Sequence, residues 1–271
     1  SSDVCSSDLR TSPFAFTGNK FEFRMVGSSD SIANANTVLN TIVADAFAQA
    51  ADELEGKENF EQAASELIAR NMREHRRIIF NGNGYSPAWV EEAARRSLPN
   101  LRSMVDAAPV LTEEKTVALF EKYGIFTRAE LESRREIMYE TYTKTKSIEA
   151  RTMVHMAGKH YIPAVIRFIT RMGDSINKAS QACPGVDVSV QTELLQNASA
   201  LLKQAQTELK ALQSAVDYLN QSEDAEQMAK FCNETVSVHM KGLRCAVDSL
   251  EMIVDKDLWP VPTYGDLMFE V

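Results

Sequence analysis

The sequence lacks the features that direct a protein to a membrane or to an oxidising compartment. No apolar run approaches the length of a membrane-spanning helix, and the first residues have neither the basic region nor the apolar stretch of a signal peptide. The four cysteines, Cys5, Cys183, Cys232 and Cys245, form no Cys-x-x-Cys pair. Cysteines so spaced are typical of reduced thiols that pack in a cytosolic protein. We therefore expect a cytoplasmic protein with no membrane partner.

Basic residues are outnumbered, with 29 Lys and Arg against 38 Asp and Glu, which gives a formal net charge of -9. This balance argues against a nucleic acid or an anionic membrane as the partner. Of the 271 residues, 44% are hydrophobic and 25% charged. That composition and length are enough for a real core, in one large domain or in two smaller ones.

Two common catalytic signatures are also missing. The glycine-rich segment from Asn81 to Gly84 is not followed by Gly-Lys-Ser/Thr, so it is not a phosphate-binding P-loop, and its glycines favour a sharp turn. His155 and His160 are five residues apart, a spacing that does not place them on one face of an α-helix. We therefore expect packing or surface histidines here, not a zinc-binding pair.

What is present near the N-terminus is the pattern of a β-hairpin. Two short runs, Pro13 to Phe16 and Lys20 to Met25, flank the turn residues Thr17, Gly18 and Asn19. Because side chains alternate along a strand, Phe21, Phe23 and Met25 share one face, and Lys20, Glu22 and Arg24 share the other.

The polar face of this predicted strand has two interpretations. It is either a solvated row of weak ion pairs or a binding surface. In the second case the Glu22 carboxylate would bind Mg²⁺ or Mn²⁺, and Arg24 and Lys20 would bind phosphate or carboxylate oxygens.

Beyond the hairpin the apolar spacing becomes helical, first from Ile32 to Ala50. Asn59 with Gln62, and Thr127 with Glu130, have the spacing of capping boxes that open further helices. Gly158 and Pro163 should kink or break the long run that follows Thr127.

The helix that begins at Phe60 is predicted to bury one apolar face and to expose a basic one. The apolar face consists of Ala63, Ala64, Leu67, Ile68, Met72 and Ile79, and the basic face of Arg70, Arg73, Arg76 and Arg77. The arginines are expected to be solvated or paired with acidic neighbours, with phosphate binding as the weaker alternative.

The C-terminal third has a coiled-coil-like pattern. Apolar residues from Leu194 to Leu219, and again from Met228 to Ile253, lie on either side of a short loop, which predicts an antiparallel helical hairpin. The tail from Leu258 is expected to dock Trp259, Tyr264 and Phe269 on the bundle. The predicted fold class is mainly α, a helical bundle with a long antiparallel helical hairpin, preceded by the β-hairpin.

Several separate motifs, in one order, resemble a known family. Arg10-Thr11-Ser12 followed by Lys20-Phe21-Glu22-Phe23-Arg24 resembles the late catalytic strand pair of glutamine synthetases. The further motifs are Phe80-Asn81-Gly82-Asn83-Gly84-Tyr85-Ser86, Trp89-Val90-Glu91-Glu92-Ala93, Leu98-Pro99-Asn100-Leu101, Glu149-Ala150-Arg151-Thr152-Met153, Pro163-Ala164-Val165 and Trp259-Pro260-Val261-Pro262-Thr263-Tyr264. Together they resemble the C-terminal part of type III glutamine synthetases, the large bacterial class, from Arg10 to Val271.

The resemblance implies a glutamate–ammonia ligase that uses ATP and Mg²⁺ or Mn²⁺. It implies that Glu22 is a metal ligand, that Arg24 holds glutamate or the transferring phosphate, and that Arg10 and Lys20 contact nucleotide phosphates. The family's homo-oligomeric ring is implied as well. Two departures stand out, because Leu9 replaces the asparagine of the family motif and the loop before Glu22 has no second arginine.

The resemblance also implies that the chain is a piece of a longer enzyme. Residues 1–9 resemble translated sequencing-adapter sequence, or else form a disordered terminus. Residues 10–56 would be the end of the catalytic domain, and residues 57–271 a helical C-terminal domain. Such a piece should be inactive alone, and the alternative function is a non-catalytic helical module for oligomerisation or interaction.

Overall fold

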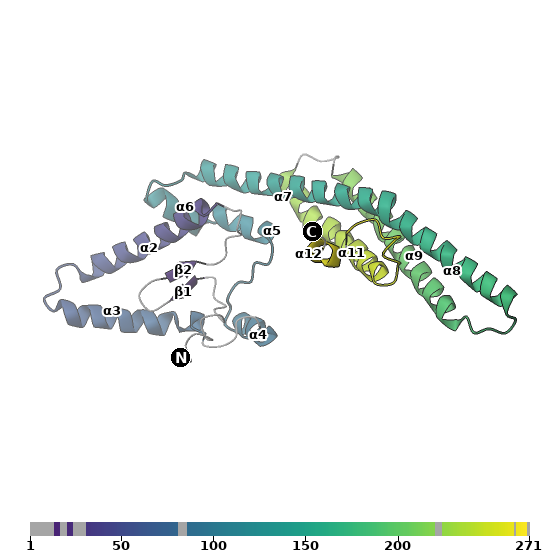
Figure 1. The fold of residues 1–271 in the computed structure, drawn as a ribbon. Coiled ribbons are helices and arrows are strands. Elements are labelled where there is room, and N and C mark those ends of the chain that lie inside the picture. The colour runs from purple at the N-terminus through teal and green to yellow at the C-terminus, as the bar shows by residue number, and fades with distance from the viewer. Residues whose placement is uncertain are drawn as a thin grey trace, which may run out of the picture. The chain divides into compact units, whose positions relative to one another are not determined.

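The computed structural model describes residues 14–16, 21–23, 31–80, 86–219, 224–262 and 264–269. They fall into two compact units, which are treated separately. Unit 1 comprises residues 1–102 and 112–131, and unit 2 comprises residues 103–111 and 132–271. The predicted mainly α class is confirmed, because helices dominate the described residues of both units (Figure 1).

Two short strands precede the helices of unit 1. β1 (Phe14–Phe16) pairs antiparallel with β2 (Phe21–Phe23), so that Phe14 lies opposite Phe23 and Ala15 opposite Glu22. These six residues are the part of the predicted hairpin that the structure describes. Its turn, and the residues that flank it on both sides, lie outside the described residues.

The helices of unit 1 follow the strands, and two of their boundaries coincide with signals that the sequence carries. They are α2 (Ala33–Leu54), α3 (Phe60–Glu74), the 3₁₀ turn η1 (Arg76–Ile78), α4 (Pro87–Arg95) and α6 (Glu114–Lys122). Gly56 takes the left-handed conformation after α2, with φ at +71°. The Asn59 side chain accepts a hydrogen bond of 3.2 Å from the amide of Gln62, which confirms the predicted cap of α3.

The core of unit 1 is small, and the predicted burial of α3 is partly wrong. Leu67 is buried as predicted, but Ile68, Met72 and Ile79 are 63%, 57% and 41% exposed. On α2, Phe47 is 70% exposed. The helical period correctly marked an apolar face, but the described part of unit 1 has nothing that covers it.

The long helical run that begins at Arg128 is continuous, so of the predicted kink or break the break is wrong, and the kink stays a prediction. α7 (Arg128–Met156) passes through the π-helical turn η3 (Ala157–Tyr161) into α8 (Ile162–Ala182). At that turn the amide of Ile162 donates to the carbonyl of Ala157, five residues back. Local π geometry is one way in which a helix accommodates a proline, here Pro163, without ending.

The predicted helical hairpin of unit 2 is formed by α9 (Ser189–Tyr218) and a returning helix. The return consists of α10 (Ala225–Phe231), the π turn η4 (Cys232–Val236) and α11 (Ser237–Glu251). Tyr218 contacts Phe231, and Glu208 contacts His239, so the pairing is antiparallel. α8 packs along α9 as well, and the three helices lie side by side in Figure 1.

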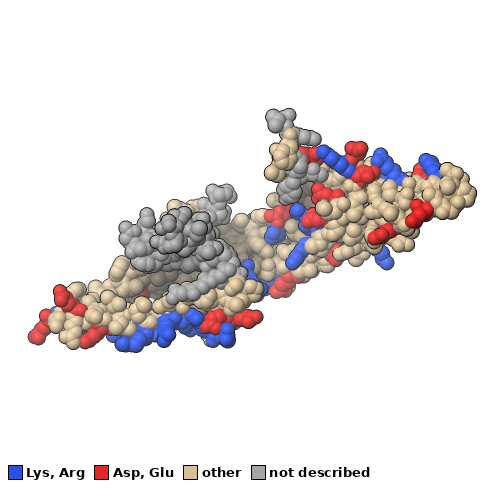
Figure 2. Space-filling model, turned by 60° about the horizontal axis from the view of Figure 1, so that its bottom comes forward, with Lys and Arg blue, Asp and Glu red and all other residues tan. Residues whose placement is uncertain are grey.

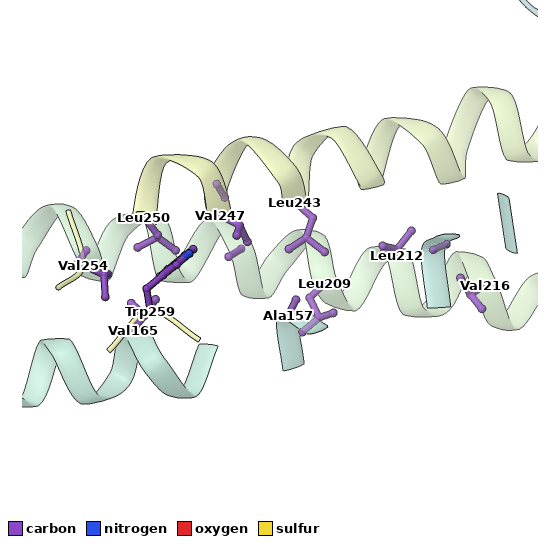
Figure 3. Packing of buried hydrophobic residues seen from close by; sticks show 14 of the residues in the cluster. Ala157, Val165, Leu209, Leu212, Val216, Leu243, Val247, Leu250, Val254 and Trp259 are labelled. Carbon is purple, nitrogen blue, oxygen red and sulfur yellow. The ribbon is translucent and has the colours of Figure 1, made fainter. Parts of the chain in front are cut away.

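The main core of the molecule lies between these helices. Leu212, Leu243 and Leu250 are at most 1% exposed within it. In Figure 3 the side chains of α11 reach between the helices, and Trp259 lies beside Val165. The predicted docking of Trp259 is confirmed, since it is 7% exposed and its ring lies 5.1 Å from that of Tyr161.

The remaining short helices are α5 (Met104–Ala107), the 3₁₀ turn η2 (Ala108–Thr112) and α12 (Tyr264–Phe269). The predicted docking of Phe269 is wrong, because it is 79% exposed, and the side chain of Tyr264 lies outside the described residues. Where the structure describes helices, none is long and apolar enough to cross a membrane.

Candidate functional site

The predicted site falls mostly outside the described residues. Arg10, Lys20 and Arg24 all lie outside them. Glu22 lies in β2, at the register position opposite Ala15, and its side chain is outside the described set. The roles assigned to these four residues therefore stay predictions.

Among the described residues, no group of three or more His, Cys, Asp or Glu side chains is arranged to hold a metal ion. Their carboxylates serve caps and ion pairs instead. At the start of α7, the Glu130 carboxylate accepts hydrogen bonds from the amide and hydroxyl of Thr127, at 2.8 and 2.9 Å. This confirms the predicted capping box.

The two histidines of the long helix do lie together, contrary to the prediction. The ring centroids of His155 and His160 are 5.6 Å apart, in an edge-to-face arrangement. The π turn η3 accounts for this, because its backbone hydrogen bonds join residues five apart and so bring positions i and i+5 closer than an α-helix does. No sequence signal that we used announces a π turn, so the α-helical period gave the wrong answer.

An acidic residue that sequence reasoning missed joins two helices of unit 1. The Asp45 carboxylate on α2 accepts hydrogen bonds from Lys122 Nζ at 2.7 Å and from the Tyr123 hydroxyl at 2.9 Å. The bond from Lys122 and then that from Tyr123 lower the pKa of Asp45 below its ordinary value. These hydrogen bonds link α2 to the end of α6 and have a structural role, and we call the three residues the Asp45 clasp.

Three buried polar atoms in unit 2 lack a hydrogen-bond partner in the described structure. They are the Tyr139 hydroxyl, the Thr143 hydroxyl and the Trp259 indole nitrogen. Nearby, Cys232 is fully buried, and burial raises the pKa of its thiol. A buried thiol of raised pKa is unreactive, so Cys232 has the packing role that we predicted.

A cavity of about 350 Å³ in unit 2 has a mostly apolar wall that includes Met153, Tyr161 and Trp259. Its one basic side chain, Arg244, makes hydrogen bonds of 2.6 and 2.8 Å through Nε to the two carboxylate oxygens of Asp248. Because its own carboxylate partner neutralises this arginine, the cavity has no surplus positive charge for phosphate chemistry.

Comparison with known proteins identifies the class of protein. Residues 63–180 match the family model described as the glutamine synthetase C-terminal domain. Over 97% of the chain, the sequence is 32% identical to a glutamine synthetase of Butyrivibrio fibrisolvens, and over 96% it is 31% identical to one of Bacteroides fragilis. The chain therefore contains a glutamine synthetase C-terminal domain and is related to glutamine synthetases over nearly all of its length.

Within that family, the similarity extends to a type-3 enzyme. The chain is 35% identical, over 96% of its length, to a type-3 glutamine synthetase of Dictyostelium discoideum. This confirms the resemblance that the motifs indicated and shows that it is not confined to bacterial enzymes. The chain spans a little over a third of these relatives, covering 36%, 38% and 37% of their lengths.

Proposed function

We propose that this chain is the C-terminal part of a glutamine synthetase that ligates ammonia to glutamate. In the reaction, an oxygen of the glutamate γ-carboxylate attacks the terminal phosphorus of ATP and ADP leaves. Ammonia then attacks the γ-carbonyl carbon, loses a proton and displaces phosphate to give glutamine. The observation that carries the proposal is the 35% identity to a type-3 enzyme over 96% of the chain.

The residues of the hairpin would contribute one edge of the active site. Glu22 supplies a carboxylate, the ligand type that Mg²⁺ and Mn²⁺ prefer, and the bound cation would neutralise charge on the phosphates. Arg24 offers a planar fork that matches a carboxylate or phosphate and would hold glutamate or the transferring group. Arg10 and Lys20 would hold the nucleotide phosphates, so that ATP and glutamate are fixed before reaction.

The remainder of the proposal follows from the relationship to glutamine synthetases. The parent enzyme would act in the cytoplasm as a homo-oligomeric ring, with ammonia, glutamate and ATP as its substrates. The alternative, a non-catalytic helical module, is compatible with this for the isolated chain. The exposed apolar side chains of α2 and α3, such as Phe47 and Ile68, favour a contribution to assembly.

The test of the catalytic proposal is Glu22→Ala in the full-length enzyme. We expect loss of most of the glutamine-forming activity with the helical circular dichroism spectrum unchanged, because a metal ligand is indispensable to the chemistry. Arg24→Lys tests the fork separately, since lysine keeps the charge and loses the bidentate geometry.

A matched control is Glu61→Ala, which removes an exposed carboxylate from the first turn of α3. It should leave turnover unchanged. Near-wild-type turnover in Glu22→Ala would instead assign Glu22 to a solvated strand face and overturn its role as a ligand.

A further inference from the structure

Three arginines meet at the end of α3. Arg76 and Arg77 from η1, and Arg96 from the end of α4, line a pocket of about 750 Å³ together with Met72, Ile79 and Phe80. We call this the arginine pocket. It lies wholly within unit 1, so its geometry is that of one compact body.

The wall of the arginine pocket is held by a network centred on Arg96. Its Nη1 donates to the carbonyl oxygens of Arg77 and Ile79, at 3.2 and 2.8 Å, and its Nε donates to Glu92 at 2.6 Å. These bonds fix the backbone that carries Arg76 and Arg77. The guanidinium also lies 5.6 Å from the ring centroid of Trp89.

The aromatic side of the pocket is similarly fixed. Phe80 stacks on Trp89, with ring centroids 4.0 Å apart and an interplanar angle of 23°. Since Phe80 lines the pocket, it presents a positioned apolar surface beside the guanidinium groups. A bound molecule would therefore meet positive charge and an aromatic wall together.

The charge of Arg76 and Arg77 is not neutralised by any carboxylate among the described residues. Neighbouring arginines do have such partners, because Arg70 pairs with Glu53 at 2.6 Å and Arg95 pairs with Glu92 at 2.9 Å. Figure 2 shows basic side chains gathered along one edge of unit 1, whereas those of unit 2 alternate with acidic ones. Arg76 and Arg77 are adjacent in the sequence, so their guanidinium groups concentrate positive charge at the pocket although the chain has a net charge of -9.

We propose that the arginine pocket binds a phosphorylated small molecule of the nucleotide class. Its phosphates would be held by Arg76 and Arg77, because guanidinium groups match phosphate oxygens bidentately. Its base would contact Phe80, and the pocket is larger than a lone phosphate needs. The residues that line this site are none of those assigned to the proposed catalytic hairpin.

The test is calorimetric titration of the chain with ATP and, separately, with inorganic pyrophosphate. ATP should bind more tightly than pyrophosphate, and binding should weaken as salt is added. The double variant Arg76→Gln/Arg77→Gln should lower the affinity for ATP at least tenfold. The control Arg102→Gln/Arg167→Gln removes the same charge from two exposed positions outside the pocket and should leave the affinity unchanged.

The double variant also separates this site from the catalytic proposal. If ATP bound at the hairpin instead, Arg76→Gln/Arg77→Gln would keep the affinity of the parent chain for ATP, and that result would overturn the inference. Equal affinities for ATP and pyrophosphate would overturn the contact assigned to Phe80. Equal losses of ATP affinity in Arg76→Gln/Arg77→Gln and in Arg102→Gln/Arg167→Gln would overturn the site, because overall charge alone would then explain the binding.

Discussion

Asp45 makes tertiary contacts that could not be predicted from the sequence. On α2 it is one acidic side chain among several, and only the fold brings Lys122 and Tyr123 to it, across 77 and 78 positions of the chain. Helix caps were predicted correctly from the sequence, because a cap such as Thr127 with Glu130 is determined by four consecutive residues. Residue contacts could be predicted where they are local, and not where they need the tertiary structure.

The Asp45 clasp should make the stability of unit 1 depend on pH. Its folded-state pKa is lowered, mainly by Lys122, so its stabilising effect is fully present above the unfolded-state pKa, near 3.8, and is lost as the pH falls through the folded-state value. Asp45→Asn should lower the melting temperature at pH 7 and have less effect below pH 3.8.

Melting curves of the two proteins between pH 7 and pH 2.5 would measure this. Asp52→Asn, a second acidic residue of the same helix with an exposed side chain, is the control. A difference between Asp45→Asn and the parent that is constant with pH would contradict the role of the charge.

At the scale of elements, helical periodicity predicted which segments are helices and failed at their irregularities. The α9 hairpin followed from its apolar pattern, whereas the π turns η3 and η4 left no signal in that pattern. Consequently the break expected at Gly158 and Pro163 is absent, and His155 meets His160. A π turn depends on packing that stabilises one extra residue, which the period of the helix alone does not contain.

The contact between α9 and α11 near Gly242 can be tested as a coupled pair. The Glu208 carboxylate accepts a hydrogen bond of 2.8 Å from His239 Nδ1, and a Cβ built on Gly242 would lie 2.7 Å from the Glu208 Cδ. Gly242→Ala should gain about 1 kcal/mol of helix propensity. It should also displace Glu208, at a cost of about 1 kcal/mol for the lost bond, so the free energy of unfolding stays nearly constant.

In a Glu208→Ala background the displacement costs nothing, and Gly242→Ala should stabilise the protein by about 1 kcal/mol. Urea unfolding of the parent, both single variants and the double variant would give the free energies of unfolding for this double-mutant cycle. An equal effect of Gly242→Ala in both backgrounds would show that Glu208 and Gly242 are not coupled.

At the scale of the whole molecule, the two units differ in how completely they bury their apolar faces. Unit 2 has a large core around Leu212 and Leu250, whereas unit 1 leaves Phe47 and Ile68 exposed in the described structure. A pattern that predicts an apolar face does not say what covers it, which is why the burial expected for α3 was partly wrong. The relatives are close to three times as long as this chain, and under the proposed function the exposed apolar faces of unit 1 are where the rest of the enzyme would pack.

Under the proposed function, the share of the relatives that the chain spans also bears on catalysis. A glutamine synthetase must hold ATP, glutamate, ammonia and metal ions in one closed site. Glu22 is the one metal ligand proposed in this chain, and a two-stranded hairpin is marginal in water. The motifs sufficed to predict the resemblance, because they are spread over the whole sequence, whereas the roles of Arg10, Lys20, Glu22 and Arg24 stay predictions because their side chains lie outside the described residues.

The most direct measurement is glutamine formation from glutamate, ammonia and ATP with magnesium, by this chain alone and by the full-length enzyme. We predict no turnover above a heat-killed control for the chain alone, and clear turnover for the full-length protein. Turnover by the chain alone would contradict the account, because it would show that residues 1–271 contain a complete site.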